Sequence, residues 1–175
     1  MTFENAKNAE AEKSDLGIQL AGKYLTFRVA QEEYGLEILK VQEIIQMQAV
    51  TKVPRTPEYV RGVINLRGKV IPVIDLRKKF GIEAANDNEK TCIIVVQITN
   101  GSSMVTMGII IDEVKEVLDI KAEHIEETPS FGSSIDTEFI LGMGKIGQNV
   151  KILLDIDKVM STGELNEIKN VTQAE

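Results

Sequence analysis

The second half of this chain of 175 residues repeats the first half almost without gaps. Segment 59–80 aligns with segment 139–160 at one constant offset and without any gap. Four residues recur as identities in this alignment, namely Gly62/Gly142, Val70/Val150, Asp75/Asp155 and Lys78/Lys158. An internal repeat of this kind means that one structural unit has been built twice. The chain is therefore expected to form two similar units related by symmetry. An enzyme would instead show an asymmetric cluster of reactive side chains.

A second repeated motif lies upstream of the first. Segment 34–45 aligns with segment 107–118 at a smaller offset, so the second copy carries a short insertion between its two motifs. Two charged residues break the match, because Glu37 faces Ile110 and Arg61 faces Leu141. A charge kept where the sister copy is apolar predicts an exposed, recognising position.

Each copy contains about five short apolar segments that are typical of β-strands. Five short antiparallel strands close most economically into a small barrel, because closure removes exposed edges. We therefore predict a mainly β protein of two five-stranded SH3-like barrels, with short helical turns and a C-terminal helix. Residues 91–98 are apolar on both faces, which predicts a central strand.

The predicted domain boundaries follow the repeat. Residues 1–21 are polar and predict a flexible tail, and residues 161–175 predict a C-terminal helix or tail. The folded domain spans 22–160, with a first unit over about 22–82 and a second over about 90–160. Exchange of strands between the two units is compatible with the sequence.

Asp75 and Asp155 stand directly before matched short helical turns. A carboxylate in this position accepts the unpaired N–H groups of the first turn, so both residues are predicted structural caps. The alternative is that Asp75 and Asp155 act as a catalytic acid and base. Their symmetric placement before matching turns disfavours this role. Most basic residues of the chain are concentrated in one region. They have two possible roles, as ordinary solvated surface charges or as the polar rim of an interaction surface. The residues are Arg55, Arg61, Arg67, Arg77, Lys78 and Lys79.

Composition excludes several classes of function. One cysteine, Cys92, and one histidine, His124, cannot form a metal cluster or an internal disulfide, and no cofactor motif is present. A formal charge of −7 and the absence of tryptophan disfavour nucleic acid as a partner. The N-terminus shows no secretory signal, and no apolar run could span a bilayer, so we expect a cytoplasmic protein.

The motifs of the first copy resemble a known family. Three runs carry the resemblance, Glu33–Ile44, Val60–Gly68 and Val70–Arg77, and the match continues through the second copy over about residues 22–160. They are similar to the bacterial chemotaxis coupling proteins, the CheW family. The resemblance implies two five-stranded SH3-like barrels and no catalytic activity. It implies an adaptor that links the cytoplasmic tip of methyl-accepting chemoreceptors to the regulatory domain of a chemotaxis histidine kinase.

The resemblance also implies a set of interacting residues and a location. Its motifs place receptor-binding candidates at Glu37, Ile38, Val41, Arg61 and Asn65, and they leave the kinase-binding residues unassigned. The protein would be recruited to receptor arrays at the inner membrane and would meet the membrane only through the receptors. A small β-barrel that binds nucleic acid is the alternative function, and binding to DNA cellulose at low salt would distinguish it.

Overall fold

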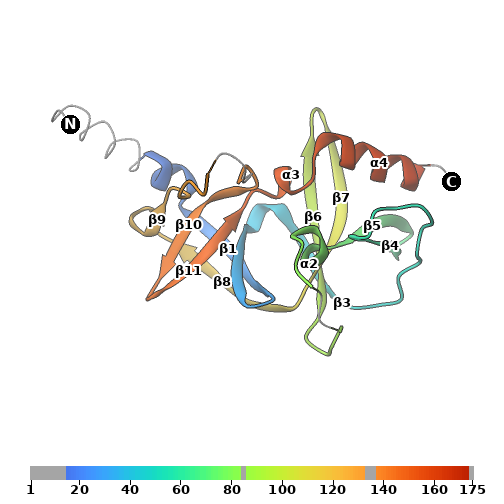
Figure 1. The fold of residues 1–175 in the computed structure, drawn as a ribbon, viewed down its shortest axis with the longest axis horizontal. Coiled ribbons are helices and arrows are strands. Elements are labelled where there is room, and N and C mark those ends of the chain that lie inside the picture. The colour runs from blue at the N-terminus through green and yellow to red at the C-terminus, as the bar shows by residue number, and fades with distance from the viewer. Residues whose placement is uncertain (1–14, 84–85, 133–136, 174–175) are drawn as a thin grey trace.

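The computed structural model describes residues 15–83, 86–132 and 137–173 and shows a mainly β protein with two sheets side by side (Figure 1). The six-stranded sheet has the order β8-β1-β2-β11-β10-β9, with β1 (Gly22–Val29), β2 (Glu32–Glu37), β8 (Glu113–Ile120), β9 (Ile125–Glu126), β10 (Ile140–Ile146) and β11 (Asn149–Leu154). The five-stranded sheet has the order β3-β6-β7-β5-β4, with β3 (Val41–Gln46), β4 (Val60–Leu66), β5 (Lys69–Asp75), β6 (Cys92–Asn100) and β7 (Ser103–Ile111).

Short helical elements join and cover the sheets. They are η1 (Ile38–Lys40), α2 (Leu76–Lys79), η2 (Ala122–His124), α3 (Ile156–Val159) and α4 (Thr162–Gln173). Figure 1 shows α2 and α3 near the junction of the sheets and α4 extending over the five-stranded sheet. The helix α4 begins with a capping box, in which Ser161 and Glu164 exchange hydrogen bonds between side chain and backbone.

Each sheet draws strands from both copies of the repeat. The strand β2 runs parallel to β11, pairing Gly35 with Leu153, and β7 runs parallel to β5, pairing Gly108 with Val73. After β2 the chain crosses through η1 into the five-stranded sheet, where β3 pairs with β6. After β7 it crosses into the six-stranded sheet, where β8 pairs with β1. The predicted units 22–82 and 90–160 therefore describe the two copies of the repeat, whereas each sheet is built from strands of both copies.

The predicted equivalence of the copies is confirmed element by element. The strands β4 and β5 and the helix α2 recur as β10, β11 and α3 at the offset of the sequence repeat. Both hairpins carry a register shift directly before the matched glycines, Gly62 and Gly142. A Cβ atom would lie 2.0 Å from the Thr51 carbonyl oxygen at Gly62 and 3.0 Å from that of Glu126 at Gly142. Glycine is needed at these two bulges because another backbone passes so close.

The core has three parts. A large shared cluster lies between the sheets, and a smaller cluster fills the interior of each. The strand β6 serves two of them, because Ile94 and Val96 face the shared core while Ile93 and Val95 face the interior of the five-stranded sheet. These four side chains are fully buried, which confirms the predicted central strand. Burial of one such side chain stabilises a fold by about 1.5–3 kcal/mol, so the shared core fixes the two sheets to each other.

Three details differ from the sequence-based expectation. The six-stranded sheet gains its sixth strand because β9 adds to the edge of β10, where Ile125 is buried. Within the described residues, the end strands of neither sheet pair with each other. Of the expected tail, residues 1–14 lie outside the described residues, whereas residues 15–20 are helical and place Leu20 against the core of the six-stranded sheet.

Candidate functional site at the first crossing

The segment that crosses from β2 to β3, residues 37–41, presents apolar side chains at the protein surface. Glu37 ends β2 opposite Tyr24, and Val41 begins β3 opposite Val96. Ile38 and Val41 pack half-buried against the shared core, whereas the Leu39 side chain between them is 95% exposed. Ile38, Leu39 and Val41 together form a small apolar patch at the surface, and apolar patches with a polar rim mark interaction sites. We call residues 37–41 the first crossing.

A small groove lies beside the first crossing. It has a volume of about 260 Å³ and is lined by Leu20, Tyr24, Glu37, Ile38 and Leu39, among others. The Tyr24 hydroxyl donates to the Leu20 carbonyl at 2.6 Å. Burial, with the neighbouring Glu37 charge, raises the pKa of Tyr24 to about 12, so its hydroxyl stays protonated and keeps this hydrogen bond. The groove is therefore a formed feature, with one acidic and one basic residue, Glu37 and Lys23, in its lining.

An ion pair fixes the first crossing to the rest of the fold. The Lys40 ammonium lies 2.8 Å from the Asp157 carboxylate in α3, and the other oxygen of Asp157 accepts the Thr99 N–H at 2.9 Å. The crossing is thus tied to α3 and to β6. These contacts fix the backbone of the turn, and the fixed backbone directs the Leu39 side chain outward.

Arg61, a predicted receptor contact, takes part in a cluster of charges. Its guanidinium lies 3.1 Å from Asp75 and 2.9 Å from Asp87. Arg77 makes a bidentate pair with Asp75 at 2.9 and 3.0 Å and reaches Asp112 and Asp87 at 3.0 Å each. The side chains of Arg77 and Asp75 are each 1% exposed. We call these five residues the charge cluster.

The charge cluster shifts the pKa values of its members. Burial alone would raise the pKa of Asp75, but hydrogen bonds from Arg77 and then Arg61 outweigh it and lower that pKa. The hydrogen bond from Arg61 is the largest cause of the lowered pKa of Asp87. Asp75 also caps α2, because its Oδ1 accepts the Arg77 N–H at 3.1 Å. Arg61 is therefore a partly exposed member of this cluster, paired with two carboxylates of the same chain.

The structure gives the remaining predicted positions separate places. Asn65 lies at the tip of the β4–β5 hairpin, where its Oδ1 accepts the Gly68 N–H at 2.8 Å and so stabilises the turn. Asp155 caps α3 by accepting the Asp157 N–H at 3.2 Å. Of the basic concentration, four residues pair with carboxylates, and these are Arg61, Arg67, Arg77 and Lys79. Glu37, Ile38 and Val41 thus lie together, whereas Arg61 and Asn65 do not join them.

Leu39 was missed by the sequence reasoning, although a signal existed. In the repeat alignment Leu39 faces Asp112, so an apolar residue stands where the sister copy has a carboxylate. The same comparison that singled out Glu37 could have found it. The sequence indicates the difference, but only the structure shows that Asp112 is buried and Leu39 exposed.

The described residues offer no arrangement for catalysis or metal binding. Among them, no group of three or more His, Cys, Asp or Glu side chains could hold a metal ion. The His124 side chain is half exposed, with Glu123 as its 3.9 Å neighbour, and Cys92 is partly buried at the start of β6. Burial raises the pKa of the Cys92 thiol, which makes it a poor nucleophile. No described helix combines the length and apolar character that crossing a membrane requires.

Comparison with known proteins agrees with this geometry. The family model described as the CheW-like domain matches residues 23–164. The chain belongs to the CheW-like family. A chemotaxis protein CheW from Klebsiella aerogenes is 39% identical over 158 residues, covering 90% of this chain and 93% of the relative. The corresponding protein from Helicobacter pylori is 33% identical over 158 residues, with coverage of 90% and 93%.

A solved structure supports the same conclusion. The scaffolding protein TtCheW from Thermoanaerobacter tengcongensis has a TM-score of 0.70 and 38% identity, covering 80% of this chain and 92% of that chain. The prediction of a mainly β, two-subdomain protein of the CheW type is therefore confirmed. This CheW-like protein is a non-enzymatic chemotaxis scaffold, as the sequence motifs indicated.

Proposed function

We propose that this CheW-like protein couples the cytoplasmic tips of methyl-accepting chemoreceptors to the regulatory domain of a chemotaxis histidine kinase. It acts in the cytoplasm, at receptor arrays of the inner membrane, and meets the membrane only through the receptors. The observation that carries the proposal is the first crossing, where Leu39 is 95% exposed between two half-buried aliphatic residues. A helical receptor tip laid against such a surface is an established mode of recognition.

The proposed receptor contact consists of Glu37, Ile38, Leu39 and Val41. The three aliphatic side chains supply apolar area, and the Glu37 carboxylate at the edge of the groove supplies polarity that selects among partners. Arg61 and Asn65 have partners inside the protein, and we propose structural roles for them.

Coupling requires a second surface that stays accessible when the receptor is bound. The two hairpins, β4–β5 and β10–β11, lie toward opposite ends of the molecule (Figure 1). They expose matched valines, Val70 at 39% and Val150 at 52%. We propose these ends as the kinase-facing surfaces, because one rigid body with separate faces can hold both partners in a fixed relation. Kinase control then depends on differential contacts in two states.

Calorimetric titration with a soluble receptor tip and with the kinase regulatory domain tests the proposal. We expect Leu39→Asp to weaken receptor binding about tenfold or more, which corresponds to about 1.4 kcal/mol, and to leave kinase binding unchanged. Met104→Asp is the matched control, because Met104 is 60% exposed and lies on β7, outside the first crossing. If the Leu39→Asp variant binds the receptor tip as tightly as the wild type, the first crossing is not the receptor-binding site. An equal loss in Met104→Asp would show that the effect is not local.

A further inference from the structure

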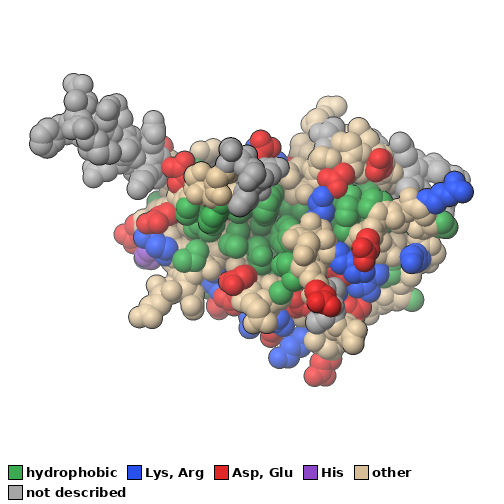
Figure 2. All heavy atoms as spheres, viewed as in Figure 1, with side chains coloured by type: hydrophobic (Ala, Val, Ile, Leu, Met, Phe, Trp, Pro, Cys, Tyr) green, Lys and Arg blue, Asp and Glu red, His purple; other side chains and the backbone are tan. Residues whose placement is uncertain are grey.

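A pocket with a basic lining lies beside the loop that joins β3 to β4, away from the first crossing. It has a volume of about 480 Å³ and is formed by residues 52–58 together with Val60, Arg61 and Lys78. Four of these residues are basic and one, Glu58, is acidic, although the whole chain has a formal charge of −7. Figure 2 shows several Lys and Arg side chains over the half of the molecule that holds the five-stranded sheet. We call this feature the basic pocket.

Most of the positive charge in the basic pocket has no counter-charge. Lys52, Arg55 and Lys78 are exposed, and none of them forms an ion pair with a carboxylate of the described residues. The fourth cation, Arg61, pairs with two carboxylates of the charge cluster. Cations gathered around one hollow repel each other, and an anion between them would remove that repulsion. The electrostatics of the basic pocket therefore favour a negatively charged ligand.

Arg55 occupies a turn position that usually belongs to glycine. In the turn over residues 53–56, Pro54 stands at the second position and Arg55, with a φ of 62°, at the third. A positive φ at the third position favours Gly, because a Cβ atom makes this conformation strained. Strained backbone of this kind is concentrated at functional sites. The strain at Arg55 therefore indicates a role for its guanidinium in the basic pocket.

Hydrogen bonds hold the loop of the basic pocket in a defined shape. At its start, the backbones of Thr51 and Val63 exchange two hydrogen bonds of 2.9 Å. Within the turn, the Thr56 hydroxyl donates to the Val53 carbonyl at 2.9 Å. Two prolines in the loop restrict the backbone further, because their rings fix φ. The pocket is therefore formed before a ligand arrives, which lowers the entropic cost of binding.

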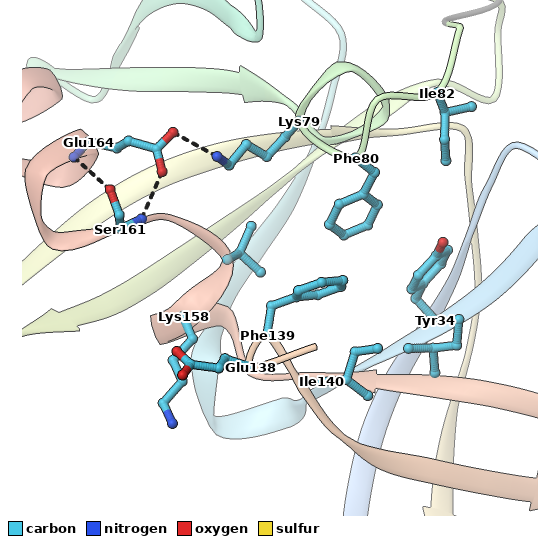
Figure 3. A pocket seen from close by; sticks show the side chains of 12 residues that line it. Tyr34, Lys79, Phe80, Ile82, Glu138, Phe139, Ile140, Lys158, Ser161 and Glu164 are labelled. Carbon is cyan, nitrogen blue, oxygen red and sulfur yellow. Dashed lines mark hydrogen bonds and ion pairs between the residues drawn. The ribbon is translucent and has the colours of Figure 1, made fainter. Parts of the chain in front are cut away.

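The lining of the basic pocket indicates which kind of anion fits. A larger groove of about 530 Å³ beside α2 and α3 is lined by three aromatic rings, those of Tyr34, Phe80 and Phe139, with successive centroids 5.5 Å apart (Figure 3). By contrast, no aromatic residue is among the described residues that line the basic pocket. It therefore offers no ring on which a nucleobase could stack. Recognition in the basic pocket depends on charge and hydrogen bonds.

We propose that the basic pocket binds a small soluble polyanion that carries two or more phosphate groups. The Arg55 guanidinium is a planar fork that can donate two hydrogen bonds to one phosphate, and the ammonium groups of Lys52 and Lys78 neutralise further charge. The volume of about 480 Å³ lies in the range of small-molecule sites. This binding is independent of the receptor contact, which lies at the first crossing.

Titration of inorganic pyrophosphate into the ¹⁵N-labelled full-length protein at low ionic strength tests the proposal. We expect the amide signals of Lys52, Arg55 and Lys78 to shift and to saturate, with a dissociation constant below about 1 mM. Added sodium chloride should weaken binding, because it screens the charges. Orthophosphate should bind less tightly, because it carries fewer charges.

Three variants and a control locate the binding. We expect Arg55→Gly to weaken pyrophosphate binding about tenfold without lowering the melting temperature, because Gly adopts the positive φ without strain. Lys78→Gln should weaken binding a few-fold, and Glu58→Gln should strengthen it a few-fold by removing a repelling charge. Lys69→Gln is the matched control, because Lys69 is exposed on β5 and does not line the pocket. It should leave binding unchanged.

Three results would overturn the proposal. The first is the absence of saturable shifts at about 10 mM pyrophosphate. The second is an equal loss of binding in Lys69→Gln and Lys78→Gln, which would mean that pyrophosphate only screens surface charge. The third is that vesicles containing an anionic phospholipid bind the protein through Arg55 while pyrophosphate does not, which would identify a lipid headgroup as the ligand.

Discussion

The two crossings between the sheets have the same place in the repeat and opposite surroundings. At the first crossing, Leu39 is exposed and Lys40 pairs with Asp157 at the surface. At the second crossing, between β7 and β8, the residue matched to Leu39 is Asp112, which is 6% exposed. Asp112 accepts from Arg77 at 3.0 Å and from the Ala30 N–H at 2.7 Å. The second crossing is filled by buried charges, whereas the first exposes aliphatic side chains at the surface.

This difference separates the features that both copies of the repeat share from those in which the two copies differ. The repeat supplies the shared backbone, hairpins and caps, which both copies need for folding. The departures from the repeat decide which crossing exposes apolar side chains and which one buries charges. Arg77, Asp75 and Asp112 form the buried part of the charge cluster, and separating these paired charges would be strongly unfavourable. An asymmetric surface thus arises on a nearly symmetric scaffold.

The largest expected effect is at the second crossing. Arg77→Ala leaves Asp112 buried without its counter-charge and leaves Asp75 with Arg61 as its remaining partner, and we expect the free energy of unfolding to fall by about 3–5 kcal/mol. The matched change at the first crossing, Lys40→Ala, removes a partly exposed pair and should cost about 0–1 kcal/mol. Urea denaturation of the purified variants measures both. Equal losses would mean that the two crossings are energetically alike.

The matched pair Glu37 and Ile110 should separate binding from stability. Ile110 is fully buried in the core of the five-stranded sheet, so Ile110→Ala should cost about 2–5 kcal/mol of stability. Glu37→Ala should leave the melting temperature within a few degrees and weaken receptor binding by about 1–2 kcal/mol. Thermal melts and receptor titrations of both variants check this. Substantial unfolding of Glu37→Ala would return Glu37 to a structural role.

The two helix caps provide a smaller contrast. Asp155→Ala should cost about 1 kcal/mol through loss of the cap, while Asp155→Asn should cost nothing, because Asn caps equally well. Asp75→Asn should be clearly destabilising, since Asp75 also neutralises Arg77 and Arg61. Chemical denaturation at neutral pH ranks the variants. A similar loss for both Asn variants would contradict the special role of Asp75.

The smallest expected effect is the pH dependence of the same two carboxyls. The lowered pKa of Asp75 means that its stabilisation is complete above about pH 4 and is lost as pH falls through the native-state pKa. Burial, and then the charge of Asp157, raises the pKa of Asp155, so its contribution has the opposite sign and stability increases as pH falls through that raised pKa. Unfolding free energies at a series of acidic pH values should show a weaker acid loss in Asp75→Asn and a stronger one in Asp155→Asn. Identical profiles would contradict this assignment.

Local chemistry accounts for the parts of the fold that could be predicted. The Asn65–Gly68 turn, the caps at Asp75 and Asp155, and the apolar strand at 91–98 each depend on residues close in sequence. The candidate site was predictable only in part. Glu37 was found as a break in the repeat, but Arg61 showed the same signal and lies in the charge cluster.

A duplicated protein of short strands, hairpins and capped turns could be predicted from the amino-acid sequence, because these features follow from side-chain alternation and local hydrogen bonding. The tertiary structure alone decided that β3 and β8 cross between the sheets, that Arg77 is buried, and that Leu39 is exposed. This is because an alignment of the two copies shows which residues correspond to each other, but not which residues lie next to each other in the fold. Strands that are apolar on both faces can pack in either sheet, and only the long-range packing of the shared core selects one arrangement.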